Sequence, residues 1–89
     1  MTIRYSKTVD WTNMWINDKK AIIGTMYRNL AADLDCGYNP LGENIRKQRQ
    51  DIANYEQDYL NTLEIFKSLT EEEINHWCFY DMLKRGAIE

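Results

Sequence analysis

The sequence is poor in cysteine, proline and histidine, and it has no long apolar run. Two cysteines among 89 residues, Cys36 and Cys78, are too few and too far apart for a disulfide framework or a zinc module. Without a long apolar run, we expect neither a secretory signal at the start nor a membrane-spanning helix. These shortages indicate a cytoplasmic protein with reduced thiols and no membrane partner.

The composition is that of one small folded domain. Hydrophobic residues make up 44% of the chain and aromatic residues 12%, which is ample for a core and argues against disorder. The net charge of −3 is unevenly spread, because the first third of the chain is basic and the remainder is acidic. This asymmetry favours antiparallel or head-to-tail pairing, or a basic partner for the acidic end.

A seven-residue repeat predicts one long helix over residues 40–69. Every member of its first row is apolar, whereas its companion row is half polar. The first row is Ile45, Ile52, Tyr59 and Phe66, and the companion row is Gln48, Tyr55, Thr62 and Leu69. Such a pattern is typical of a helix that packs lengthwise on other helices over a limited contact.

Another long helix is predicted before it, over residues 10–36, because apolar residues recur there at steps of three and four. The polar run at residues 17–20 leaves open a kink or two shorter helices, and Gly24 indicates either a close helix contact or a bend. Gly37 is suited to end this helix, and Asn39-Pro40 is suited to begin the next one. The short link between them predicts an antiparallel hairpin.

A third helix, over residues 71–85, has the clearest local signals. Thr70 and the three glutamates that follow it form a capping box at its start, and Gly86 is suited to end it. We expect this helix to fold back along the second half of helix 40–69, with Trp77 facing the core. Because consecutive helix positions diverge by about 100°, Phe79 and Tyr80 cannot both join Trp77 there, so at least one of them should be exposed.

The predicted fold class is therefore all-α, an antiparallel hairpin of two long helices plus a shorter third helix. Residues 10–89 form the single helical domain. Residues 1–9 form an N-terminal arm that is compatible with an extended segment, a disordered leader or an early helical turn. Since the third helix is about half as long as its neighbour, the half of the hairpin near the link has only two helices. Unless the arm covers it, that half needs another chain, which predicts a homodimer with four helices there.

No pattern in the sequence predicts catalysis or metal binding. His76 and Cys78 point about 200° apart on one helix, so they cannot cooperate as base and nucleophile. The Glu73 to His76 spacing occurs once, whereas a di-metal bundle repeats it. We therefore expect a protein that is not an enzyme and that has no catalytic residue, metal or cofactor.

The remaining candidate site is the half of the hairpin near the link, which also carries the one basic cluster. The predicted partner-binding residues are Tyr38, Leu41, Ile45, Arg46, Lys47, Arg49 and Ile52. We expect a small interaction protein that presents helix faces to a partner protein, such as an inhibitor or adaptor from a mobile genetic element. The alternative is a binder of nucleic acid or nucleotide phosphate that uses Arg46, Lys47 and Arg49, with Arg28 nearby.

Overall fold

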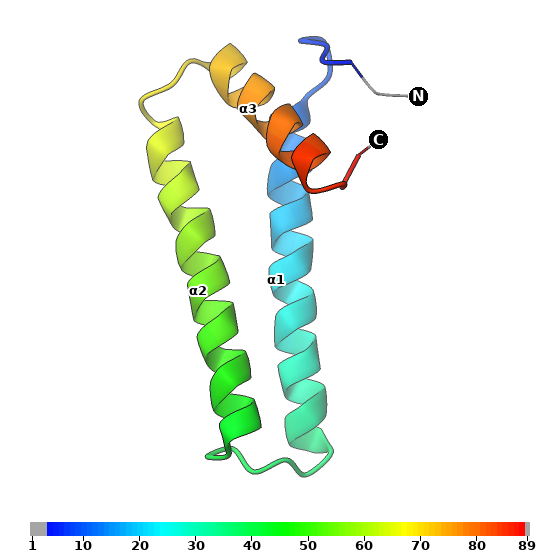
Figure 1. The fold of residues 1–89 in the computed structure, drawn as a ribbon, viewed down its shortest axis with the longest axis vertical. Coiled ribbons are helices and arrows are strands. Elements are labelled where there is room, and N and C mark those ends of the chain that lie inside the picture. Colours follow the sequence, from blue (N-terminus) through cyan, green and yellow to red (C-terminus); the bar gives the residue numbers. More distant parts are fainter. Residues whose placement is uncertain (1–3, 89) are drawn as a thin grey trace.

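The computed structural model describes residues 4–88 and contains three α-helices (Figure 1). They are α1 (Trp11–Asp35), α2 (Glu43–Phe66) and α3 (Glu71–Lys84). No strand occurs in the described part of the chain, so the structure confirms the all-α class and the hairpin with a shorter third helix. None of these helices is both long and apolar enough to cross a bilayer, within the residues described.

The two ends of helix α1 are set by a capping side chain at its start and by a glycine just after its last turn. The Oδ1 atom of Asp10 accepts a hydrogen bond of 3.0 Å from the backbone N–H of Asn13, which satisfies one free donor of the first turn. The helix then runs without a break through residues 17–20. The prediction of one long helix is therefore confirmed, and the alternative of two shorter helices is wrong. The helix ends before Gly37, whose φ of 93° is the left-handed conformation that glycine adopts at little cost.

The link between α1 and α2 is longer than predicted, and Asn39-Pro40 does not begin the second helix. The Oδ1 atom of Asn39 accepts a hydrogen bond from the N–H of Leu41 at 3.0 Å, and its carbonyl accepts one from Gly42 at 2.9 Å. Asparagine commonly competes with a helix in this way, by bonding the backbone two residues on. Helix α2 therefore begins at Glu43, with Gly42 as its N-cap.

Helix α3 has the predicted capping box. The N–H of Glu73 donates to Oγ1 of Thr70 at 3.2 Å, and the N–H of Thr70 donates to Oε1 of Glu73 at 2.9 Å. The bond from the Thr70 backbone holds the pKa of the Glu73 carboxyl below its ordinary value. At the other end Gly86 has a φ of 75°, and the N–H of Ala87 donates to the carbonyl of Met82 at 2.9 Å, as in a Schellman motif.

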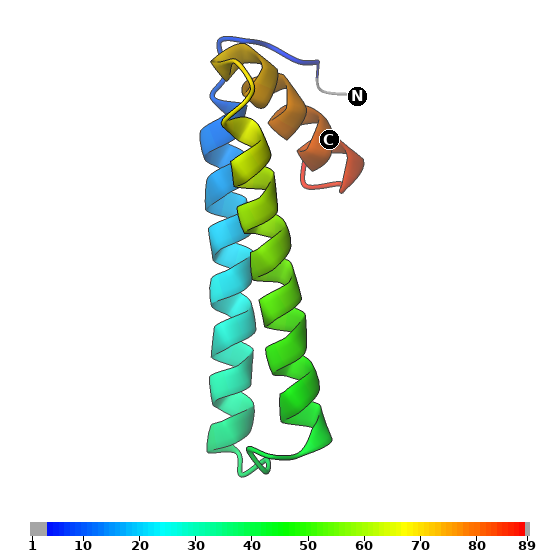
Figure 2. The same cartoon turned by 90° about the vertical axis from the view of Figure 1, so that its left-hand side faces the viewer.

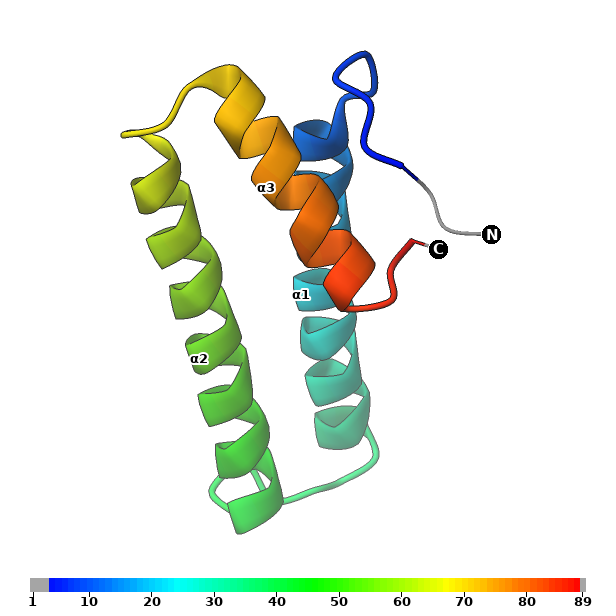
Figure 3. The same ribbon diagram turned by 45° about the horizontal axis from the view of Figure 1, so that its top comes forward.

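The placement of α3 differs from the prediction, because it packs across α1 instead of returning along α2 (Figures 2 and 3). Its buried side chains are Cys78, Phe79 and Met82. The Phe79 ring lies 5.0 Å from the ring of Trp11 at the start of α1. Trp77 is 40% exposed and Tyr80 is 58% exposed, so Trp77 is less buried than expected, while Tyr80 is exposed and Phe79 is not.

The hydrophobic core lies at the end of the hairpin that carries α3, which we call the head. Its buried members are Trp11, Trp15, Phe66, Cys78, Phe79 and Met82. The described part of the arm packs against this cluster through Tyr5 and Val9, and the indole N–H of Trp11 donates to the carbonyl of Ser6 at 3.0 Å. The described residues of the arm, 4–9, therefore lie at the head and not at the opposite end of the hairpin, residues 36–42; residues 1–3 lie outside the described part of the chain. We call the opposite end, residues 36–42, the tip.

Candidate partner-binding surface

The tip half of the hairpin has two helices and buries two of the predicted contact residues. Ile45 is 0% exposed and Ile52 is 4% exposed, although α3 and the arm both lie at the head (Figure 1). Both isoleucines belong to the apolar row of α2, and α1 is the neighbouring helix at that level. They therefore stabilise the hairpin from inside and present little surface to a partner in this state.

The polar companion row of α2 links the two helices. The amide nitrogen of Gln48 donates to the carboxylate of Asp33 on α1. About two turns further along α2, the Tyr55 hydroxyl accepts from Nζ of Lys19 on α1 at 3.3 Å. Polar residues at the seam between two helices commonly fix the register of the helices in this way, at some cost in stability. The sequence marks these positions as polar, but it does not reveal their partners.

At the tip itself two large apolar side chains are exposed. Leu41 is 84% exposed and Tyr38 is 51% exposed. Both lie in the link whose conformation is held by Gly37 and by the Asn39 turn. Both are among the predicted contact residues, and the link that carries them forms the end of the molecule farthest from α3 (Figure 1).

The three cationic residues of the predicted cluster are also exposed. Arg46, Lys47 and Arg49 lie in the first two turns of α2, and none of them forms an ion pair within residues 4–88. They fan around the helix, since neighbouring positions diverge by about 100°. Arg28 does not join them through any described contact, and its guanidinium instead donates to Oγ1 of Thr25 on its own helix at 3.0 Å.

A shallow groove of about 420 Å³ lies in the tip half, between α1 and α2, and none of the four cationic residues lines it. Met26 and Ile52 supply its apolar part, and the carboxylates of Asp33 and Asp51 flank it. This groove could not be predicted from the sequence. No single run of residues encodes it, because its lining comes from two helices that meet in the hairpin.

No family model, curated protein or solved structure matches the chain. The geometry of the side chains must therefore carry the assignment of function.

The two residues with nucleophile and base chemistry, Cys78 and His76, lie in different surroundings. Cys78 is 0% exposed, and burial raises the pKa of its thiol to about 12, so the reactive thiolate is absent at neutral pH. His76 is exposed and lies between two tyrosine rings, 4.3 Å from that of Tyr5 and 4.8 Å from that of Tyr80. Among residues 4–88, no group of three or more side chains has the geometry to hold a metal ion.

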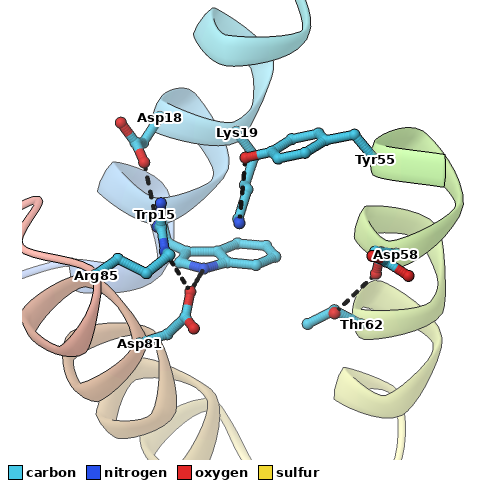
Figure 4. A network of polar contacts seen from close by, with 8 residues as sticks. All are labelled: Trp15, Asp18, Lys19, Tyr55, Asp58, Thr62, Asp81 and Arg85. Carbon is cyan, nitrogen blue, oxygen red and sulfur yellow. Dashed lines mark hydrogen bonds and ion pairs between the residues drawn. The ribbon is translucent and has the colours of Figure 1, made fainter. Parts of the chain in front are cut away.

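A polar network at the head joins α3 to α1 (Figure 4). The carboxylate of Asp81 accepts from the indole N–H of Trp15 at 2.8 Å and from Nε of Arg85 at 3.0 Å. The same guanidinium bonds Asp18 at 3.2 Å. These groups satisfy one another, and no buried side-chain nitrogen or oxygen in the described residues lacks a partner. The network therefore holds α3 across α1.

The same figure shows Lys19 of α1 between two aromatic rings (Figure 4). Its Nζ lies 5.4 Å from the centre of the Trp15 ring and 5.0 Å from that of the Tyr55 ring, within the range of a cation–π contact. On the facing side the hydroxyl of Thr62 donates to the carbonyl of Asp58 on its own helix at 2.9 Å. Lys19 thus connects α1 to α2 below the head.

Proposed function

We propose that this protein is a non-catalytic interaction protein that binds a partner protein through its tip. The observation that supports this proposal most directly is the 84% exposure of Leu41 in the link that also carries the exposed ring of Tyr38. A leucine and a tyrosine at the end of a helical hairpin lose contact with water only when another molecule covers them. Burying such side chains contributes about 1.5–3 kcal/mol each, and tyrosine is enriched among residues that dominate binding.

The chemistry of the tip also indicates the partner's surface. Arg46, Lys47 and Arg49 lie in the first two turns of α2, which follow the link that carries the apolar pair, and they form no ion pair within the described residues. A partner that combines an apolar pocket with acidic groups around it would satisfy both features, and the charges would speed the encounter. A small protein with one such surface is suited to act as an inhibitor or an adaptor.

The experiment is a pull-down from native cytosol. The tag is placed at a terminus, because both ends of the described chain lie at the head, away from the tip (Figure 1). We compare the wild type with the double variant Tyr38→Ala, Leu41→Ala. The matched control is Leu60→Ala, Ile65→Ala, which removes side chains that are 55% and 62% exposed on α2. The wild type and the control should recover the same protein, and the tip variant should lose it.

Two results would contradict the tip proposal. One is that the wild type recovers no specific protein. The other is that the tip variant recovers the same protein as efficiently as the control does. Circular dichroism of each variant checks that the helices are intact, so that a loss of binding reports the surface and not unfolding.

A second candidate is binding of nucleic acid or nucleotide phosphate, and the exposure of all three cations favours it. This function predicts retention on nucleic acid at low salt and a steep loss as salt rises, because bound cations would release counterions. Arg46→Ala and Arg49→Ala should each weaken retention, whereas Lys67→Ala should not, because Lys67 pairs with Glu64 at 2.8 Å elsewhere on α2. No retention at low salt would eliminate this candidate.

We also propose that the chain forms a homodimer, and its uneven charge distribution, which favours antiparallel pairing, supports this proposal. The apolar residues Ile45 and Ile52 are buried within one chain, so they do not require a second copy to cover them at the tip. A second surface, on α3, offers a more specific contact.

A further inference from the structure

The outer face of α3 carries a stripe of four residues, Glu73, Trp77, Tyr80 and Lys84. Their steps of four, three and four place them along one side of a helix. All four are exposed, with Trp77 at 40% and Tyr80 at 58%. Figure 3 shows α3 lying across the outside of the hairpin with no other described helix beyond it. The stripe is thus an unpartnered surface with two large aromatic rings at its centre.

The two rings of the stripe pack against other aromatic side chains of the same chain. Trp77 packs edge-on against Trp15 at 5.6 Å and Phe66 at 5.4 Å, measured between ring centres. Tyr80 is supported by the ring of His76 at 4.8 Å and by that of Phe79 at 5.6 Å. Rings that are already ordered lose little conformational freedom when a partner covers them. The stripe is therefore preorganised for binding.

The order of charges along the stripe is the second observation. An acidic residue stands at its start, the two rings lie in the middle, and a basic residue stands at its end. When such a stripe meets a copy of itself in antiparallel orientation, every residue faces its complement. Glu73 meets the partner's Lys84, and Trp77 meets the partner's Tyr80. The two-fold axis then repeats both contacts, because a two-fold interface uses one patch twice.

We propose that α3 packs antiparallel against α3 of a second copy through this stripe, which makes it the homodimer contact. The inference rests on the proposed self-association and names its surface. A second copy is the favoured occupant because the charge order is its own complement, so one stripe supplies two ion pairs and two Trp–Tyr contacts. One carboxylate oxygen of Glu73 is used in the capping box, and the other oxygen faces the ammonium of the partner's Lys84.

The arrangement leaves both tips free. The stripe lies at the head, at the opposite end of the hairpin from Tyr38 and Leu41 (Figure 1). A dimer formed through α3 therefore presents two identical tips, and the tip variants described above should not alter the association.

The test is the dissociation constant of the dimer, measured by sedimentation equilibrium over a wide range of concentrations. The variants are Tyr80→Ala and Lys84→Glu, and the matched control is Leu60→Ala, whose side chain is exposed off the stripe on α2. We expect the wild type and the control to dimerise alike, and each stripe variant to weaken the dimer by about tenfold or more. Trp77 is left unchanged because its replacement would also damage the core.

A double-mutant cycle that removes the two charges tests the antiparallel pairing itself. Glu73→Gln keeps the capping box, since glutamine serves at that position, yet it removes the charge opposite the partner's Lys84. Glu73→Gln and Lys84→Gln remove the same ion pair, so the double variant should be no weaker than either single variant. Fully additive losses would overturn the pairing.

The other outcomes separate the two proposals. A wild type that stays monomeric at every concentration overturns both the homodimer and its α3 contact, and assigns the stripe to a different protein. A dimer that persists unchanged in Tyr80→Ala and Lys84→Glu overturns the α3 contact alone. Neither result bears on binding of a partner protein at the tip.

Discussion

One side chain, that of Asn75, ties three separate parts of the chain together. Its Oδ1 accepts from the backbone N–H of Thr12 at 3.0 Å and from the Thr12 hydroxyl at 3.3 Å. Its amide nitrogen donates to the carbonyl of Val9 at 2.9 Å and to the Tyr5 hydroxyl at 3.4 Å. The arm, the start of α1 and α3 thus meet at one half-buried amide. Nothing in the sequence around Asn75 distinguishes it from the exposed asparagines, so this role could not be predicted.

Replacing Asn75 should cost more than replacing an exposed asparagine. In Asn75→Ala the Thr12 N–H loses its acceptor in a partly buried place, and the Val9 carbonyl keeps only its bond from the N–H of Trp11. We therefore expect the free energy of unfolding to fall by about 1–3 kcal/mol. The control is Asn54→Ala, which removes one exposed bond from Gln50 and should change little. Urea unfolding measures both, and equal effects would show that Asn75 does not join the segments.

The buried thiol of Cys78 should make stability depend on alkaline pH. Burial raises the pKa of this thiol from 9.0 to about 12, so above pH 9 the unfolded chain ionises first. The thiol's contribution to stability is therefore complete below pH 9 and is lost as the pH rises toward 12. Cys78→Ala should lack this part of the decline, and the difference between the two denaturation profiles isolates the thiol from the tyrosines. A constant difference across that range would contradict the assignment.

At the scale of the helices, the ends were predictable where a local signal had no competitor. Thr70 and Glu73 cap α3, and Gly37 and Gly86 end α1 and α3 with positive φ. The start of α2 was not predictable in the same way, because Asn39 bonds its own neighbours and forms a turn. Asn39 can cap a helix or can form a turn with the residues that follow it, and the sequence alone does not show which of the two it will do.

Two glycines should respond in opposite ways to alanine. A Cβ at Gly24, inside α1, would meet only the guanidinium of Arg28 at 3.8 Å, an ordinary contact. Gly24→Ala should therefore raise the free energy of unfolding by about 0.5–1 kcal/mol. Gly37→Ala should lower it by about 1 kcal/mol, because alanine is strained in the left-handed conformation. Thermal unfolding of both variants checks the signs, and a destabilising Gly24→Ala would mean that this glycine has an undetected packing role.

The crossing of α3 over α1 depends on contacts between distant residues. The pattern in α3 predicts an apolar face, and it correctly places Cys78 and Met82 there. Which neighbour receives that face is decided by the Trp15–Asp81–Arg85 network and by the arm, which stacks Tyr5 at 5.5 Å from Phe79. Those partners are about 65 to 75 residues apart in the chain. Periodicity within a helix contains no information on such pairs.

The whole molecule is uneven in its stability. The buried cluster of six residues lies at the head and includes neither Ile45 nor Ile52, so the tip half is held by one helix pair. Regions with few buried apolar contacts open more readily than the core. We expect amide hydrogens near residues 36–42 and in the adjoining turns to exchange fastest, and those around Trp15 and Cys78 to exchange slowest. Hydrogen exchange measures this order, and uniform protection would show that the hairpin opens only as a unit.

Both ends of the described chain lie at the head, and the long axis of the molecule extends 48 Å from there toward the tip (Figure 1). Anything joined to either terminus, such as a surface anchor or a fluorescent fusion, would therefore hold the tip at a distance comparable to that axis. Cys36, an exposed thiol in the tip link, provides a natural attachment point for a dye at the far end. Labelled there and immobilised at a terminus, the protein would become a molecular probe whose sensing end projects away from its support.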